Sequence, residues 1–212
     1  MLQHSRKTVD SLYTQPFRNL GSVFIHSGFG QYKDLPTWTG FDKKSPPSLK
    51  IGLSAIRFPV NVQNYNIQAQ REVFEICARE TLDTPEFSNS FCMFEGYGVH
   101  GVKAIASEST AFPHRDDNIT ICPVVLYDNK AQDLELDAKA IAFGEKLRQT
   151  IFAASSQREL HAYVNYASGD EKLESLYGFE PWRLQKLAAL KRKYDPEGKF
   201  SYYAPVIQNA LH

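Results

Sequence analysis

Residues 161–200 read HAYVNYASGDEKLESLYGFEPWRLQKLAALKRKYDPEGKF, and this stretch contains the clearest signals of fold and function in the chain. It begins with a cluster of aromatic and amide side chains, Tyr-Val-Asn-Tyr, at residues 163–166. A helix is predicted to begin at Pro181, because the fixed backbone angle of proline suits the first helical turn. That helix is predicted to end before Asp195-Pro196, so the sequence places a helical segment near this end of the chain.

Strand and helix signals alternate in the residues before this stretch. Short apolar runs bounded by Gly, Asn or Asp predict strands with one buried face. Apolar residues that recur at helical spacing predict two amphipathic helices. The predicted strands are residues 22–26, 49–58, 90–97 and 119–127, and the last two are expected to be neighbours in the sheet. The predicted helices run from 62 to 83–85 and from about 132 to 154. Residues 28–47 are predicted to form a loop.

These elements together predict an α+β fold. The expected architecture is an antiparallel or mixed sheet with helices packed on one face, plus a C-terminal helical segment. The chain has no internal repeat, low-complexity tract or charge block that would mark a linker. One compact unit is therefore expected.

The bulk composition excludes several classes of partner. Twenty-four basic residues balance 24 acidic residues, so we expect no strong field that attracts nucleic acid or an anionic membrane. No apolar run is long enough to span a bilayer, and the N-terminus lacks the apolar core of a secretory signal, which predicts a soluble, cytoplasmic protein as the sequence stands. Cys77, Cys92 and Cys122 are far apart and odd in number, so three buried thiols are expected.

Two blocks of residues resemble one known family. The first is Tyr-x-Asn-Tyr at 163–166, followed in order by Tyr177-Gly178, Arg183-Leu184, Lys191 and Tyr194-Asp195-Pro196. The second block contains Phe-Glu-Gly-Tyr-Gly at 94–98 and Thr-Ala-Phe-Pro-His-Arg at 110–115. Both blocks resemble the berberine bridge enzyme-like, FAD-linked oxidoreductases.

The resemblance implies a domain organisation and a cofactor. Residues 1–158 would be part of the family's substrate-binding domain, and residues 159–212 its C-terminal segment. The family's N-terminal flavin-binding domain is expected to be missing from 212 residues, and the sequence contains neither Gly-x-Gly-x-x-Gly nor a P-loop to hold a pyrophosphate. FAD is thus the family's cofactor, but we expect this chain alone not to bind it.

The resemblance also assigns roles to the aromatic cluster. It implies that Tyr166 is an acid-base residue and that Tyr163 and Asn165 lie near the flavin. In an extended segment, side chains alternate, so Tyr163 and Asn165 would point one way and Tyr166 the other. The alternative is that these residues only satisfy backbone groups near a turn.

The second block supplies candidate residues for catalysis and substrate binding. Glu95, near the end of an apolar strand, is a candidate acid or base, and Tyr97 is a candidate to orient a substrate through its hydroxyl. A solvent-facing carboxylate is the alternative for Glu95. His114 is a candidate substrate contact, although a local salt-bridged turn with Arg115 and the following aspartates explains it at least as well.

The remaining histidines give no sign of a metal centre. His26, His100 and His161 are scattered and lack a spaced set of carboxylates or cysteines. The sequence therefore predicts no metal site.

Three functions stay open at this point. The chain is the substrate-domain portion of an FAD-linked oxidoreductase that acts on a small hydrophobic or polyketide-like molecule, a flavin-independent isomerase or cyclase, or a non-catalytic binding module. Without a flavin domain, apolar side chains around Trp182, Leu187, Tyr202 and Tyr203 would meet water. A homodimer, a separate flavin domain or a rearranged C-terminal segment is expected to cover them.

Overall fold

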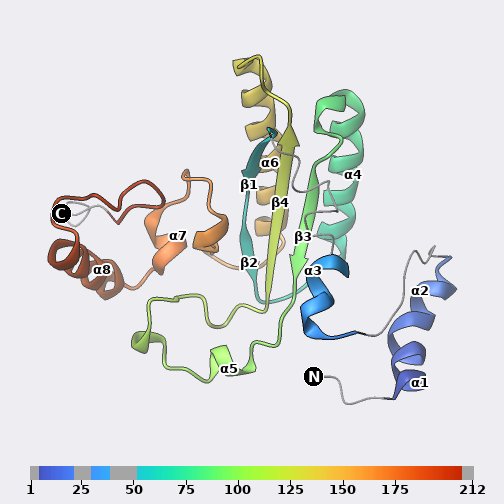
Figure 1. The fold of residues 1–212 in the computed structure, drawn as a ribbon, viewed down its shortest axis with the longest axis horizontal. Coiled ribbons are helices and arrows are strands. Elements are labelled where there is room, and N and C mark those ends of the chain that lie inside the picture. The colour runs from blue at the N-terminus through green and yellow to red at the C-terminus, as the bar shows by residue number, and fades with distance from the viewer. Residues whose placement is uncertain (1–4, 22–29, 39–51, 207–212) are drawn as a thin grey trace. The chain divides into compact units, whose positions relative to one another are not determined.

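A computed structural model describes residues 5–21, 30–38 and 52–206 (Figure 1). The chain divides into two compact units, Met1–Lys50 and Ile51–His212. The described part of the first unit is helical, with elements α1 (Arg6–Val9), η1 (Asp10–Thr14), α2 (Gln15–Asn19), η2 (Tyr32–Asp34) and α3 (Leu35–Trp38).

Two sequence predictions fall in the first unit. The strand predicted at residues 22–26 lies outside the described residues. The loop predicted at 28–47 is wrong for residues 32–38, which form helical turns. A capping box explains why: Gln31 caps the backbone of Asp34, and the Asp34 carboxylate accepts the Gln31 N–H at 2.8 Å.

The second unit is built on a four-stranded antiparallel sheet with β4 (Ile119–Tyr127) at its centre. One edge of β4 pairs with β3 (Phe91–Glu95), and the other pairs in succession with β1 (Ser54–Arg57) and β2 (Val60–Val62). The predicted pairing of residues 90–97 with 119–127 is confirmed. The strand predicted at 49–58 is confirmed over β1.

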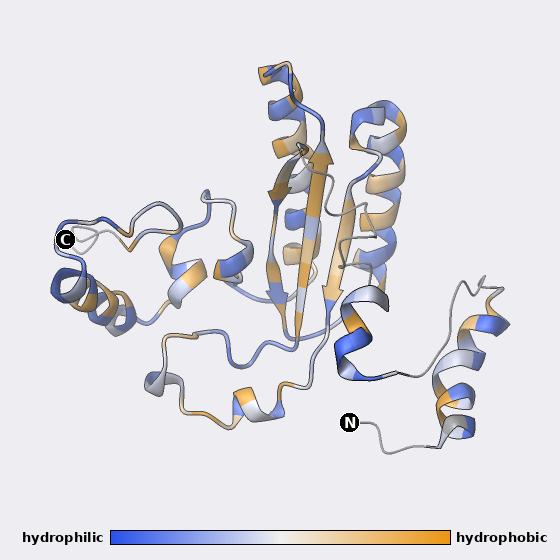
Figure 2. Ribbon diagram, viewed as in Figure 1, coloured by the Kyte–Doolittle hydropathy of each residue, from blue (hydrophilic) through white to orange (hydrophobic). Residues whose placement is uncertain are grey.

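Two long helices, α4 (Ile67–Asp83) and α6 (Leu134–Ala153), pack on one face of this sheet (Figure 1). Their buried side chains meet those of the strands in the main hydrophobic core, in which Val73 and Phe143 contribute from the helices and Val125 from β4. Figure 2 shows the hydrophobic residues running along β4 and the mixed, amphipathic character of both helices. The predicted α+β fold with helices on one face is confirmed.

The helices start where side chains cap their first N–H groups. Asn66 accepts the N–H of Ala69 at 3.0 Å, so α4 begins at Ile67 rather than at Val62, which belongs to β2. Asp133 caps α6 in the same way. Capping therefore decides a boundary that apolar periodicity alone placed five residues too early.

The opposite face of the sheet meets the C-terminal part of the unit. Cys122, Val124 and Leu126 are buried there, and Tyr166 packs against them. Tyr166 belongs to a single 3-10 turn, η5 (Val164–Tyr166), which is followed by α7 (Leu173–Tyr177) and α8 (Pro181–Tyr194). The helix predicted to begin at Pro181 is confirmed, and it ends at the residue before Asp195.

Short elements complete the unit, namely η3 (Pro85–Phe87), α5 (His100–Lys103) and η4 (Ser107–Ser109). Among the described residues, no helix is both long enough and apolar enough to cross a membrane.

The cysteines and the exposed aromatic residues refine two predictions. Cys122 is buried, and burial raises the pKa of its thiol to about 12, whereas Cys77 and Cys92 are only partly buried. The prediction of three buried thiols is therefore correct for one.

At the C-terminal end, Tyr202 is fully exposed and Trp182 is 37% exposed. Coverage of this surface by a partner stays a prediction.

Candidate functional site

A cavity of about 490 Å³ lies at the end of β3 that carries Glu95. Its wall combines the residues after β3 with the residues that lead into β4, and Tyr163 closes it from the C-terminal segment. Apolar side chains from both stretches, including Val99, Phe112 and Ile119, line it. A cavity of this size and character suits a small organic ligand.

Three predicted site residues contact one another, with Tyr97 and Tyr166 both bound to Glu95. The Tyr166 hydroxyl donates to Glu95 Oε1 at 3.1 Å, and the Tyr97 hydroxyl donates to the same oxygen at 3.2 Å. Glu95 and Tyr97 line the cavity, and Tyr166 reaches Glu95 from a segment 71 residues away. Glu95 is partly buried, so it is not simply a solvent-facing carboxylate.

The surroundings of Tyr166 keep its phenol protonated at neutral pH, so it is a hydrogen-bond donor to Glu95. Burial, the hydrogen bond to Glu95 and the Glu95 charge together raise the pKa of Tyr166 to about 12. The phenol therefore stays protonated at neutral pH. Both phenols bind Oε1, and Oε2 of Glu95 accepts no hydrogen bond from the described residues.

The aromatic cluster is not extended, and the predicted alternation of its side chains is wrong. Because η5 is a 3-10 turn, the rings of Tyr163 and Tyr166 lie on the same side and meet edge to face, with centroids 5.2 Å apart. Asn165 donates its amide N–H to the Tyr163 hydroxyl at 2.6 Å. The side chains of Tyr163, Asn165 and Tyr166 thus lie in one region rather than two.

His114 is buried, and the predicted salt-bridged turn is wrong for it. Its Nε2 donates to the Ser175 carbonyl at 2.7 Å, and its ring stacks on His161 with centroids 4.3 Å apart. Burial, followed by the nearby His161 charge, lowers the pKa of His114 to about 4. His114 is therefore a neutral part of the cavity wall.

The sequence indicated that His161 is isolated, but the structure gives it close partners. Its Nδ1 lies 2.9 Å from Asp117 Oδ2, and together with His114 these residues place ligand atoms within 4.8 Å of one another. A metal ion needs lone pairs that converge in the planes of both rings, whereas the two imidazoles stack at an interplanar angle of 16°. We therefore assign no ion to this cluster.

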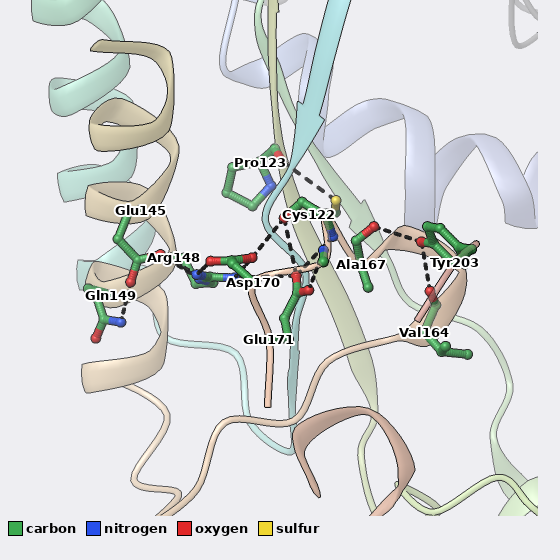
Figure 3. A network of polar contacts seen from close by, with 12 residues as sticks. Cys122, Pro123, Glu145, Arg148, Gln149, Val164, Ala167, Asp170, Glu171 and Tyr203 are labelled. Carbon is green, nitrogen blue, oxygen red and sulfur yellow. Dashed lines mark hydrogen bonds and ion pairs between the residues drawn. The ribbon is translucent and has the colours of Figure 1, made fainter. Parts of the chain in front are cut away.

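A second polar cluster, which sequence reasoning missed, anchors the segment that contains Tyr166 (Figure 3). Arg148 extends from α6 and forms ion pairs with Glu145, Asp170 and Glu171. The Arg148 side chain is only 6% exposed and that of Glu171 is fully buried. The local pattern of α6 predicts only the i,i+3 pair with Glu145, because Asp170 and Glu171 lie 22 and 23 residues away in the sequence.

Hydrogen bonds to backbone groups fix the segment between residues 164 and 171, which contains the acidic partners of Arg148. Glu171 accepts the N–H groups of Ser168 and Gly169 at 3.1 and 3.0 Å. The Tyr203 hydroxyl lies 2.9 Å from the Val164 carbonyl and 2.6 Å from that of Ala167, so it bridges the two ends of the η5 turn (Figure 3). These contacts hold Tyr166 in place over Glu95.

The site fits the ring of a flavin better than its pyrophosphate. Asn165 is exposed, and its carbonyl oxygen accepts no hydrogen bond from the described residues, so Tyr163 and Asn165 offer an aromatic face and an amide to a polar heterocycle. Arg115, the one arginine or lysine among the described residues that line the cavity, donates to the Val102 carbonyl and the Thr110 hydroxyl. The described wall therefore fits a ring or a substrate, whereas one guanidinium by itself is not the cradle of backbone N–H groups that a glycine-rich loop at a helix N-terminus offers a diphosphate.

Comparison with known proteins finds relatives among the FAD-linked oxidoreductases. No protein-family model matches the chain. It is 40% identical over 206 residues to the FAD-linked oxidoreductase chyH of Penicillium rubens, which covers 97% of this chain and 41% of that protein. It is 38% identical to the FAD-linked oxidoreductase chry5 of Gibberella zeae, over 97% of this chain and 40% of the relative. The chain thus spans about two fifths of the length of these curated relatives.

Solved structures show the same fold. A berberine bridge enzyme variant superposes with a TM-score of 0.71 at 16% identity, over 99% of this chain and 45% of that chain. The berberine bridge enzyme of Eschscholzia californica superposes with a TM-score of 0.65, also at 16% identity, over 97% of this chain and 45% of that one. The resemblance found in the sequence is confirmed. Over the part of those proteins that it matches, the chain is a homologue of FAD-linked oxidoreductases with the fold of the berberine bridge enzymes.

Proposed function

We propose that this chain is the substrate-contacting portion of an FAD-linked oxidoreductase that oxidises a small, largely apolar molecule of the secondary-metabolite type. The observation that supports this most is the Glu95 carboxylate, which lines an apolar cavity and accepts hydrogen bonds from two phenols. The part of the proposal that says the reaction is an FAD-linked oxidation rests on the names of the relatives.

Glu95 acts as the proton acceptor in this scheme. Oxidation of an alcohol, amine or activated C–H removes a hydride and a proton from the substrate. The chemistry that FAD would supply when bound is acceptance of the hydride. The proton passes to Oε2 of Glu95, while Tyr97 and Tyr166 hold Oε1 through their hydroxyls and so fix the direction of the carboxylate. Tyr163 and Asn165 would hold the polar edge of the flavin ring.

The test is oxidation by the chain combined with FAD and with the portion of the relative chyH that this chain does not match, because the described residues of the chain alone offer no seat for the FAD diphosphate. A panel of phenolic and polyketide-like molecules is incubated with protein, and both hydrogen peroxide and product mass are measured. Removal of a general base typically costs about 10²–10⁴-fold in rate, so Glu95→Gln should lose at least about 100-fold. Tyr166→Phe should lose less, because Glu95 keeps its second phenol. Tyr202→Phe changes a fully exposed phenol and serves as the matched control.

The same measurement separates the proposal from its rivals. A product two mass units lighter than the substrate that forms only with FAD supports the oxidase. Conversion without a change in mass and without FAD favours an isomerase or cyclase that uses the same Glu95 and Tyr166 pair. Binding without conversion of any kind indicates a binding module and contradicts the oxidase.

A further inference from the structure

Arg115 is a buried cation in the wall of the cavity. Only 9% of this residue is exposed, and it lines the cavity beside Phe112 and Val102. Its guanidinium lies 5.9 Å from the centre of the Phe112 ring. Among the described residues, no carboxylate forms an ion pair with it, although Asp116 and Asp117 follow it directly in the sequence.

The guanidinium is also short of hydrogen-bond partners. Nη1 donates to the Val102 carbonyl at 2.8 Å, and Nη2 donates to the Thr110 hydroxyl. The Nε atom is buried and has no partner in the described part of the chain. Arginine offers five N–H donors, so two have partners here, and both partners are neutral.

The two carboxylates that line the same cavity are occupied by other groups. Asp117 interacts with His161 through Oδ2 and accepts from Gln157 through Oδ1. Glu95 accepts both of its hydrogen bonds from phenols. Neither carboxylate therefore neutralises Arg115 by direct contact.

A buried charge is costly unless an opposite charge or several hydrogen bonds compensate it. A guanidinium is well suited to this, because its planar fork matches the two oxygens of a carboxylate. We propose that the cavity binds an apolar, ring-containing molecule with one acidic oxygen group, a carboxylate or an ionised phenol or enol, and that Arg115 is the counter-charge of that group.

This inference extends the proposed function by naming the chemistry of the substrate, and it rests on that function only in taking the cavity as the ligand site. Arg115 would hold the acidic end of the molecule, and Glu95 would meet its oxidisable end. The two residues together would give the substrate one orientation in an otherwise apolar cavity.

Binding of a matched pair of probes tests the inference without any redox step. 2-Naphthoate and 2-naphthamide have nearly the same shape, but only the first is an anion at neutral pH. Isothermal titration calorimetry of each probe against the unmodified chain should give an affinity for naphthoate about tenfold or more above that for naphthamide, as expected of a hydrogen bond between charged groups.

Variants assign the preference to Arg115. Arg115→Met keeps much of the side-chain bulk and should abolish the preference for naphthoate while naphthamide binds as before. Arg115→Lys keeps the charge without the planar fork and should retain only part of the preference. Lys103→Met removes a neighbouring positive charge from a residue outside the cavity wall and should leave the preference unchanged.

Each outcome decides the matter. Equal binding of the two probes by the unmodified chain, or binding of neither, overturns the inference even if Arg115→Met fails to fold. A naphthoate preference that survives in Arg115→Met also overturns it. If the preference follows Arg115 but no molecule is oxidised, the proposed function fails and the anion site stands.

Discussion

The second unit holds the carboxylates of Asp170 and Glu171 and the carboxylate of Glu95 with different kinds of partner. Asp170 and Glu171 are bound to the Arg148 guanidinium, and Glu171 also accepts two backbone N–H groups, so this cluster is ionic and closed. Glu95 is bound only by neutral phenols, lines a cavity and keeps one oxygen without a partner among the described residues. The first arrangement suits a fixed anchor, and the second suits a group that exchanges protons with a ligand.

The two regions are connected through the segment between residues 163 and 171. Tyr166 lies at one end, over Glu95, and the partners of Arg148 lie at the other. We therefore expect the anchor to position Tyr166 without touching the site. Separating the two experimentally means damaging one region and asking what happens to the other.

The largest expected effect comes from breaking the anchor. Arg148→Met leaves the carboxylates near residue 170 without their cation, and loss of one member of a buried ion pair costs on the order of 3–5 kcal/mol. Asp170 is half exposed, so we expect the lower end of this range. The free energy of unfolding from urea titration measures it. Lys146→Met, which removes an exposed ion pair with Glu80 on the same helix, is the control and should cost less than about 1 kcal/mol.

Arg148→Met would also show whether the anchor positions Tyr166. If the variant loses stability but keeps full rate in the oxidation assay, the segment does not depend on Arg148 for its geometry. Arg148→Lys should recover part of the stability, since it restores the charge but not the fork.

Acid is expected to lower the free energy of unfolding by a smaller amount. The cavity wall and the Arg148 anchor should respond in different pH ranges. The pKa of His114 is lowered to about 4, so between pH 6.5 and 4 the unfolded chain binds a proton that the folded chain does not. Stability should therefore be complete above pH 6.5 and fall as the pH drops towards 4, by up to about 3 kcal/mol.

The anchor should respond at lower pH. Burial opposes ionisation of Asp170, but the hydrogen bond and charge of Arg148 outweigh it and keep the pKa of that carboxyl below its ordinary value. Its contribution is present above about pH 3.9 and is lost only below that. Thermal melts from pH 7 to 4 on the parent and on His114→Gln, which can still donate to Ser175, isolate the His114 effect. An identical pH dependence in both proteins would contradict it.

The sequence predicted elements that depend on local signals and missed contacts that depend on distance in the chain. The strand at Ile119–Tyr127 and the helix from Pro181 follow from an apolar run and from a proline at the first turn, and both are where they were expected. The start of α4 was misplaced because a short strand and a cap at Asn66 precede it. Apolar periodicity does not register either feature.

The site was predicted as a set of residues but not as a geometry. Glu95, Tyr97 and Tyr166 were each named, yet their meeting at one carboxylate depends on a 3-10 turn that brings Tyr166 to the same side as Tyr163. The roles of His161 and Arg148 were missed because Asp117 and Asp170, their acidic partners, are 44 and 22 residues away. Arg115 was noted only as a neighbour of His114, since burial without a counter-ion is not visible in a sequence.

The hydrogen bond from Tyr166 to Glu95 is the contact on which the account of the site depends, and NMR of the chain labelled at the Cζ carbon of tyrosine measures it directly. Tyr166→Phe assigns the Tyr166 signal, which is then followed from pH 8 to 11 in the parent and in Glu95→Gln. With a pKa of about 12, Tyr166 should stay largely protonated to pH 11 in the parent and should ionise at lower pH once Glu95 is neutral. Ionisation near pH 10, identical in both proteins, would contradict the pairing of this phenol with Glu95.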